Sequence, residues 1–173
     1  FVQSQVDASG TVIGGELLMR WNHPVRGNVP PSRFIPVAES SGLILRMGDW
    51  MILQACETLA RLHAAGQELL ISVNVSERQF RQDDFVERVL GMLAQTGAPA
   101  ALLILEVTES LLVGDTHQAR EQLAQLRAWG VTIALDDFGT GYSSLAYLRD
   151  LPIDVMKVDR AFVKDLGRDP TAL

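Results

Sequence analysis

Five side chains with oxygen donors stand near the ends of short apolar segments, and their chemistry is that of a divalent-metal site. The set comprises Glu16, Asn74, Glu106, Asp136 and Asp137. An ionised side chain inside an apolar interior costs several kcal/mol unless it is paired or bound to a metal ion. Carboxylates with one amide oxygen, and without Cys or a paired His, suit hard ions such as Mg²⁺ or Mn²⁺. Adjacent aspartates permit one carboxylate to bridge two ions, as in two-metal phosphoryl chemistry.

Two more polar residues, Lys157 and Asp159, end the segment Val-Met-Lys-Val-Asp. Lys157 adds a donor that could orient a metal-bound water or offset phosphate charge. A salt bridge to a neighbouring carboxylate is the simpler interpretation, and both can hold. Any single Asp or Asn after a strand is most often the N-cap of the next helix. Five strands that end in this way favour a shared site.

The elements that must position these residues follow from the pattern between them. Short runs of Leu, Ile and Val predict buried strands at 69–75, 102–107, 131–136 and 153–158, and helical periodicity covers 84–96, 116–129 and 143–149. Strands that are apolar on both faces and separated by helices predict parallel βα units. Because parallel strands end at one rim, the polar residues should converge there.

The first third of the chain has a different pattern. Segments 1–6 and 12–20 predict an antiparallel hairpin that opens the domain, followed by a proline-rich connection and helices at 32–40 and 47–65. The sequence contains no low-complexity stretch or interdomain linker, so residues 1–173 are expected to form one domain.

Residues typical of helix ends agree with these boundaries. Glycines that can form left-handed C-caps stand at Gly66, Gly97 and Gly130. Helix starts are marked by Ser76 with Gln79, which have capping-box spacing, and by the candidate N-caps Asp83 and Asp115.

Composition narrows the classes of protein. A net charge of −6 with scattered basic residues argues against wrapping a nucleic-acid backbone, although a small anion remains possible where metal ions supply positive charge. The single cysteine, Cys56, is expected in the core and fits a reducing compartment. No membrane segment or signal peptide is visible, so we expect a cytoplasmic domain, either alone or as the cytoplasmic part of a larger, membrane-attached protein. We interpret His23 as a loop residue, and Trp21, Trp50 and Trp129 as packing groups, with Trp21 adjoining the rim.

The loop Asp-Asp-Phe-Gly-Thr-Gly-Tyr-Ser-Ser-Leu at 136–145 resembles the signature of EAL domains, bacterial phosphodiesterases of cyclic di-GMP. The resemblance extends, in the family's order, through segments 15–21, 34–39, 72–76, 106–110 and 157–160, and so covers essentially the whole chain. It implies an α/β fold, a TIM-like (β/α) barrel with an antiparallel early strand.

The resemblance also implies roles. Glu16, Asn74, Glu106 and Asp136 would bind a first metal ion, Mg²⁺ or Mn²⁺, and Asp136 with Asp137 a second. Lys157 would hold the attacking water, with Asp159 close by. Gln3 and Arg20 would contact the substrate, and Glu109 would anchor the 136–145 loop. The implied reaction is attack of water on one phosphodiester of cyclic di-GMP, which gives linear pGpG.

Three departures from the family pattern stand out. Leu17 replaces the Ala of the motif that names the family, and Ser4 replaces a Pro. The third is length, because the family's domain has roughly 250 residues, as such barrels do, and this chain ends after its sixth predicted strand. The last two strands, with a late Glu metal ligand and a late Gln, are expected to be missing from this chain.

Other functions remain open at this point. The main alternative is a receptor or regulatory module that binds cyclic di-GMP without cutting it. An unrelated Mg²⁺ barrel enzyme would have a similar carboxylate rim, but its chemistry does not explain the 136–145 loop. The resemblance further implies an adjoining GGDEF or sensory domain in the full protein, and family members often form homodimers.

Overall fold

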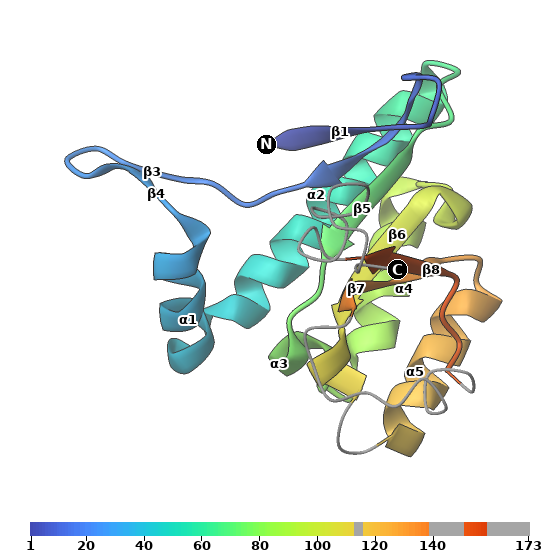
Figure 1. Ribbon diagram of the computed structural model, residues 1–173. Helices are drawn as coiled ribbons and strands as arrows, with labels where there is room; N and C mark the ends of the chain where they lie inside the picture. Colours follow the sequence, from blue (N-terminus) through green and yellow to red (C-terminus); the bar gives the residue numbers. More distant parts are fainter. Residues whose placement is uncertain (113–115, 139–150, 159–173) are drawn as a thin grey trace, which may run out of the picture.

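The computed structural model describes residues 1–112, 116–138 and 151–158, and its centre is a six-stranded sheet (Figure 1). The strands lie in the order β1 (Val2–Val6), β2 (Val12–Leu17), β5 (Leu70–Asn74), β6 (Leu103–Thr108), β7 (Thr132–Phe138) and β8 (Val155–Val158). β1 is antiparallel to β2, and every other neighbouring pair is parallel. The predicted opening hairpin and the predicted parallel βα units are therefore both present.

The two faces of the sheet differ in chemistry because successive side chains of a strand point to opposite faces. One face is apolar and packs against the helices α2 (Leu43–Ala64), α4 (Phe85–Thr96) and α5 (Thr116–Ala128). In β5, Ile71 and Val73 belong to this core, while Ser72 between them belongs to the other face. The core between sheet and helices thus fixes which residues can face the barrel interior.

Glycine ends three helices as predicted. Gly66, Gly97 and Gly130 have φ values of 74°, 68° and 91°, in the left-handed region that an L side chain rarely adopts. Each lies a few residues before a strand, so the chain reverses there. Cys56 is fully buried in α2, as expected.

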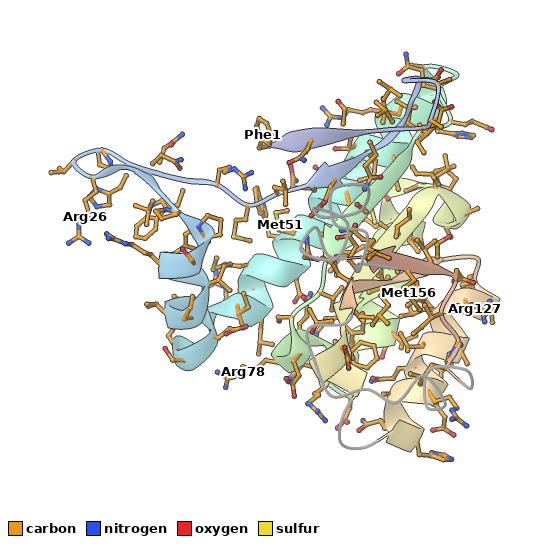
Figure 2. The ribbon with its side chains drawn as sticks, viewed as in Figure 1. Phe1, Arg26, Met51, Arg78, Arg127 and Met156 are labelled. Atoms are coloured by element: carbon orange, nitrogen blue, oxygen red, sulfur yellow. The ribbon has the colours of Figure 1, made fainter. Side chains whose placement is uncertain are left out.

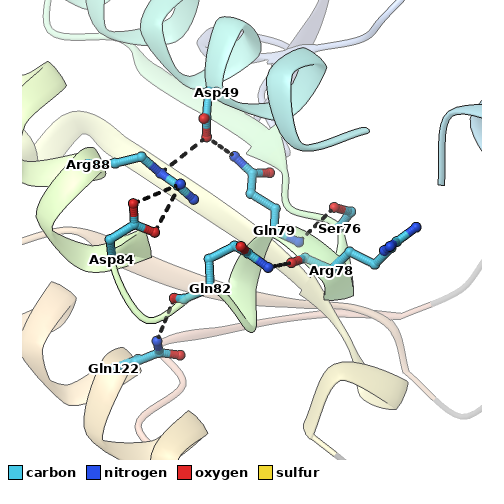
Figure 3. Close-up of polar contacts among 8 residues, drawn as sticks. All are labelled: Asp49, Ser76, Arg78, Gln79, Gln82, Asp84, Arg88 and Gln122. Carbon is cyan, nitrogen blue, oxygen red and sulfur yellow. Dashed lines mark hydrogen bonds and ion pairs between the residues drawn. The ribbon is translucent and has the colours of Figure 1, made fainter. Parts of the chain in front are cut away.

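The start of the short helix α3 (Glu77–Phe80) is only partly as predicted. Ser76 Oγ accepts a hydrogen bond from the backbone N–H of Gln79 at 3.2 Å, which is the first half of a capping box. The side chain of Gln79 does not return to Ser76, however; its amide donates to Asp49 Oδ1 of α2 at 3.0 Å (Figure 3). A contact between helices therefore replaces the second half of the cap.

The prediction of Asp83 as an N-cap was wrong. α4 begins after Asp84, and the Asp83 carboxylate instead accepts a hydrogen bond from Gln118 of α5 at 3.2 Å. Asp115 and the predicted helix at 143–149 lie outside the described residues.

The region between β2 and α2 is more structured than the sequence indicated. A two-stranded antiparallel hairpin of β3 (Trp21–His23) and β4 (Gly27–Val29) stands where only a connection was predicted. His23 is thus a strand residue rather than a loop residue, and its Nδ1 accepts the backbone N–H of Val25 at 3.1 Å. Strands of three residues are too short to show alternation, so the pattern could not reveal them.

The helices that follow begin earlier than predicted. α1 covers Pro31–Ser41, and α2 starts at Leu43, directly after Gly42 with φ 78°. Two 3₁₀ turns, Ala100–Leu102 and Glu109–Leu112, flank β6. No helix in the described ranges has the length and apolar character needed to cross a membrane.

Candidate active site at the strand ends

The side chain of Lys157 gathers three carboxylates from three other strands. Its Nζ lies 2.6 Å from Glu106 Oε2, 3.3 Å from Asp136 Oδ1 and 3.6 Å from Glu16 Oε2. Asn74 joins the group, because its Nδ2 donates to Glu16 Oε1 at 2.9 Å. Residues from five strands, separated by up to 141 positions between 16 and 157, therefore meet at one point.

The strand registers explain this meeting. Asn74 is paired with Glu106 across β5 and β6, and Glu106 with Ala134 across β6 and β7. Ala134 in turn is paired with Val155 of β8. Asp136 is paired with Thr108, two residues beyond Glu106 on β6, so Asp136 and Glu106 lie on one face. The register between β7 and β8 shifts between Leu135 and Phe138, and Lys157 reaches Asp136 through its side chain, at 3.3 Å. The predicted convergence follows from the parallel register of β5 to β7 together with the long side chain of Lys157.

Glu106 is 2% exposed, and its burial and its charged neighbour Lys157 act in opposite directions on the pKa of its carboxyl group. Burial raises the pKa of its carboxyl group above the ordinary value, and hydrogen bonds from Lys157 and Ser72 oppose that shift. For Lys157, burial works to lower the pKa, but the hydrogen bond to Glu106 and the charges of Glu106, Asp136 and Glu16 raise it overall. Lys157 is thus held as a cation.

The charge balance of this group favours a further cation. Three carboxylates surround one ammonium, so the group has an excess of negative charge even with Lys157 protonated. Its donors are carboxylate and amide oxygens, which suit hard divalent ions. Within the described residues, no three His, Cys, Asp or Glu side chains stand close enough to hold a metal ion by themselves. The donor chemistry fits such an ion, while the present arrangement centres on the ammonium.

The remaining predicted site residues are placed as follows. Gln3 is exposed on β1 and pairs in register with Glu16. The Arg20 guanidinium lies 5.2 Å from the centre of the Phe1 ring and donates to the Met19 carbonyl at 2.9 Å.

Glu109 is buried and opens the 3₁₀ turn after β6. The backbone of Asp137 lies in β7, whereas its side chain and the whole of Asp159 lie outside the described residues.

Two polar residues of this face, Ser72 and Gln5, were not predicted from the sequence to belong to the site. Ser72 is fully buried and hydrogen-bonds Glu106, and Gln5 Nε2 donates to Ser72 Oγ at 3.3 Å. A polar residue between two apolar neighbours in the middle of a buried strand was the available signal. Ser72 connects the antiparallel strand β1 to the carboxylate that holds Lys157.

Comparison with known proteins agrees with this architecture. The family model described as "EAL domain" matches residues 1–173. A cyclic di-GMP phosphodiesterase of Pseudomonas aeruginosa, NbdA, is 46% identical over 160 residues, which cover 92% of this chain and 20% of NbdA. MucR of the same organism, a bifunctional diguanylate cyclase/cyclic di-GMP phosphodiesterase, is 42% identical over 162 residues, 93% of this chain and 24% of MucR. The chain thus spans about a fifth to a quarter of the length of these relatives.

Solved structures show the same fold. The PaMucR phosphodiesterase in complex with c-di-GMP has a TM-score of 0.91 and 41% identity, covering 99% of this chain and 70% of that one. The EAL enzyme Bd1971, bound to cAMP and cyclic di-GMP, has a TM-score of 0.91 and 36% identity, with 99% and 48% covered. The predicted TIM-like barrel class is confirmed, and the chain belongs to the EAL domain family.

Proposed function

We propose that this chain is the phosphodiesterase domain of a bacterial signalling protein and that it hydrolyses cyclic di-GMP to linear pGpG with the help of divalent metal ions. The observation that carries the proposal is the meeting of Glu16, Glu106 and Asp136 around Lys157 at the strand ends. Relatives named as cyclic di-GMP phosphodiesterases support the substrate.

The metal ligands in this proposal are the oxygen donors of the rim. Glu16, Asn74, Glu106 and Asp136 would hold one ion, and Asp136 with Asp137 a second. Mg²⁺ or Mn²⁺, when bound there, would offset phosphate charge and lower the pKa of water. The excess negative charge around Lys157 supports such binding.

The chain's own residues would supply orientation and charge. Lys157 is anchored by Glu106 at 2.6 Å, which fixes the position in which its ammonium would hold the attacking water. Ser72 hydrogen-bonds Glu106 and thereby lowers the pKa of that carboxyl group, against the effect of burial. The burial of Glu106, whose side chain is 1% exposed, strengthens its electrostatic contact with Lys157.

Substrate contacts and loop control complete the proposal. Arg20 would bind a phosphate of cyclic di-GMP, Gln3 would contact the substrate beside Glu16, and Asp159 would act next to Lys157. Glu109, buried after β6, would anchor the 136–145 loop. In the full protein, an adjoining GGDEF or sensory domain and a homodimer would regulate the site.

The test is hydrolysis by the full-length protein that carries this chain. With Mn²⁺ and cyclic di-GMP, chromatography should show pGpG, and Asp136→Asn or Glu106→Gln should lower kcat at least ~100-fold. Glu121→Gln is the matched control, because Glu121 is a carboxylate on α5 with a side chain 62% exposed, and it should leave the rate unchanged. Full activity in Asp136→Asn would refute the proposed site. Tight binding without metal and without turnover would establish the receptor function instead.

A further inference from the structure

Residues of the β3–β4 hairpin and of the helices α1 and α2 line a groove. These elements lie on the side of the molecule away from the strands β6 to β8 (Figure 1). The volume of the groove is about 1080 Å³. Ten of the fifteen residues that line it are apolar, and four of the other five are arginines. None of the carboxylates around Lys157 lines this groove.

Large apolar side chains are exposed along the groove. Val37 of α1 is 62% exposed, and Leu43 and Trp50 of α2 are 51% and 55% exposed. Leu43 and Trp50 are seven residues apart, so they lie on one side of α2, two helical turns from each other. The prediction of Trp50 as a packing group was therefore wrong, and so was that of Trp129, which is 66% exposed. A continuous apolar hollow of this kind marks an interaction site on a water-soluble surface.

The charge around the groove is opposite to that of the rest of the chain. Residues 19–50, the span of the groove's lining, contain four arginines (Arg20, Arg26, Arg33 and Arg46) and two acidic residues, Glu39 and Asp49, which gives 4 − 2 = +2. The whole chain has a net charge of −6, so the remainder carries −6 − 2 = −8. Figure 2 shows Arg26 at the outer end of the hairpin, extended from the body of the molecule.

Three of the four arginines, Arg26, Arg33 and Arg46, are available for a partner, while Arg20 is the proposed phosphate contact. No ion pair joins any of them to a carboxylate within residues 1–112, 116–138 and 151–158. Arg26, Arg33 and Arg46 are exposed side chains, and a guanidinium pairs readily with carboxylates through its planar fork. The groove therefore combines an apolar floor with a basic border that is complementary to an acidic ligand.

We propose that this groove binds an amphipathic helix of a partner protein, apolar on the face that enters the groove and acidic along its two borders. A concave channel between two helices and a hairpin suits a helix about 10 Å wide, which inserts apolar anchors at i, i+3, i+4 and i+7. Met19 and Met47 in the lining can adapt to the shape of those anchors. A flat anionic membrane would reach the arginines but not the apolar floor of a hollow.

The test is selection from a display library of 16-residue helical peptides, with the four anchor positions apolar and the flanking positions random. The expected result is enrichment of Asp and Glu at the flanks. Trp50→Ala should weaken binding of the selected peptides about tenfold or more, because a buried Trp anchor is typical of binding hot spots. Arg33→Glu should weaken them about fivefold and reduce the dependence of affinity on salt.

Matched controls separate the groove from a general surface effect. Trp129, 66% exposed at the end of α5, lies outside the groove, and Trp129→Ala should leave affinity unchanged. Arg120→Glu, an exposed arginine of α5, should do the same.

Four outcomes would overturn the proposal. They are the absence of any binder in the library, enrichment of basic flanks, binding that Trp50→Ala does not weaken, and self-association of the chain through the groove that peptides fail to displace. Binding of the groove to anionic lipid vesicles in place of peptides would likewise assign it to a membrane. Since no residue of the proposed metal site is changed, hydrolysis of cyclic di-GMP is an independent readout.

Discussion

The ammonium of Lys157 lies 2.6 Å from Oε2 of Glu106, whose side chain is 1% exposed, so the two form a largely buried ion pair between β8 and β6. Among the strands that the structure describes, β8 is the outermost on its side of the sheet, and β7 lies between it and β6. The pair therefore links two strands that are not neighbours, as well as fixing a candidate catalytic group.

Removing the cation of this pair should destabilise the protein. Lys157→Met leaves Glu106 buried without its partner, and we expect a loss of about 3 kcal/mol in the free energy of unfolding at pH 8. Urea denaturation measures this. Adding Glu106→Gln should recover most of the loss, because an amide carries no charge. Arg81→Ala, which breaks an exposed pair with Glu77, should cost less than about 1 kcal/mol.

The same variant gives a prediction on pH. Burial already raises the pKa of Glu106, and loss of Lys157 should raise it further. A carboxyl group with a raised folded-state pKa favours the folded protein at low pH and loses that contribution as pH rises through the shifted value. The difference in stability between Lys157→Met and the unmodified protein should thus be small near pH 5 and large near pH 8. A difference that is independent of pH would contradict this account.

A divalent ion should counteract the loss of Lys157. The carboxylates of Glu16, Glu106 and Asp136 would then face a metal ion in place of the ammonium, and an ion that binds only the folded state stabilises it by mass action, by about 2.7 kcal/mol at a concentration 100 times its Kd. We expect Mn²⁺ to raise the Tm of Lys157→Met more than that of Lys157→Met/Glu106→Gln. Equal shifts of Tm in both variants would show that Glu106 does not bind the metal ion.

The repeated units of the fold were predictable from sequence because local signals there agree with each other. Apolar runs, glycine C-caps and helical periodicity all placed β5 to β7 and their helices within a few residues of their observed bounds. Site residues near the ends of those strands converged as expected, since parallel register alone is enough to bring Asn74, Glu106 and Asp136 to one rim.

What could not be predicted depends on contacts between distant segments. The residues around Gln79 in the sequence do not indicate that its side chain would hydrogen-bond Asp49 instead of Ser76. The packing of α3 against α2 brings Asp49 within reach of Gln79. The exposure of Trp50 depends in the same way on where α1 and the β3–β4 hairpin stand. Long-range placement, rather than local propensity, decided these cases.

The contact between α2 and α3 gives a prediction on packing. Gly48 of α2 faces the buried side chain of Gln79, and a Cβ at position 48 would lie 2.1 Å from Gln79 Oε1. Gln79 is fully buried and bonded to Asp49, so it cannot move aside without losing that bond. We expect Gly48→Ala to destabilise the protein by about 1–3 kcal/mol in thermal unfolding.

Gly91 of α4 is the matched control, because a Cβ there meets nothing within 4 Å. Gly91→Ala should stabilise the protein by about 0.5–1 kcal/mol through the better helix propensity of alanine. In the double variant Gly48→Ala/Gln79→Ala the clash is gone, so the two substitutions should be strongly non-additive. Additive effects would show that the contact with Gln79 is not the cause.

Cys56 should be unreactive in the folded protein. Its side chain is fully buried in α2, and burial raises the pKa of the thiol to about 11. Since the thiolate is the nucleophile, only about 1 in 1,000 molecules would carry it at pH 8, apart from the barrier to access. Reaction with a disulfide reagent at pH 8 should therefore occur at the rate of global unfolding and rise steeply in urea. Rapid labelling without urea would show that the core around α2 opens locally, and it would assign Cys56 to a reactive site instead of the core.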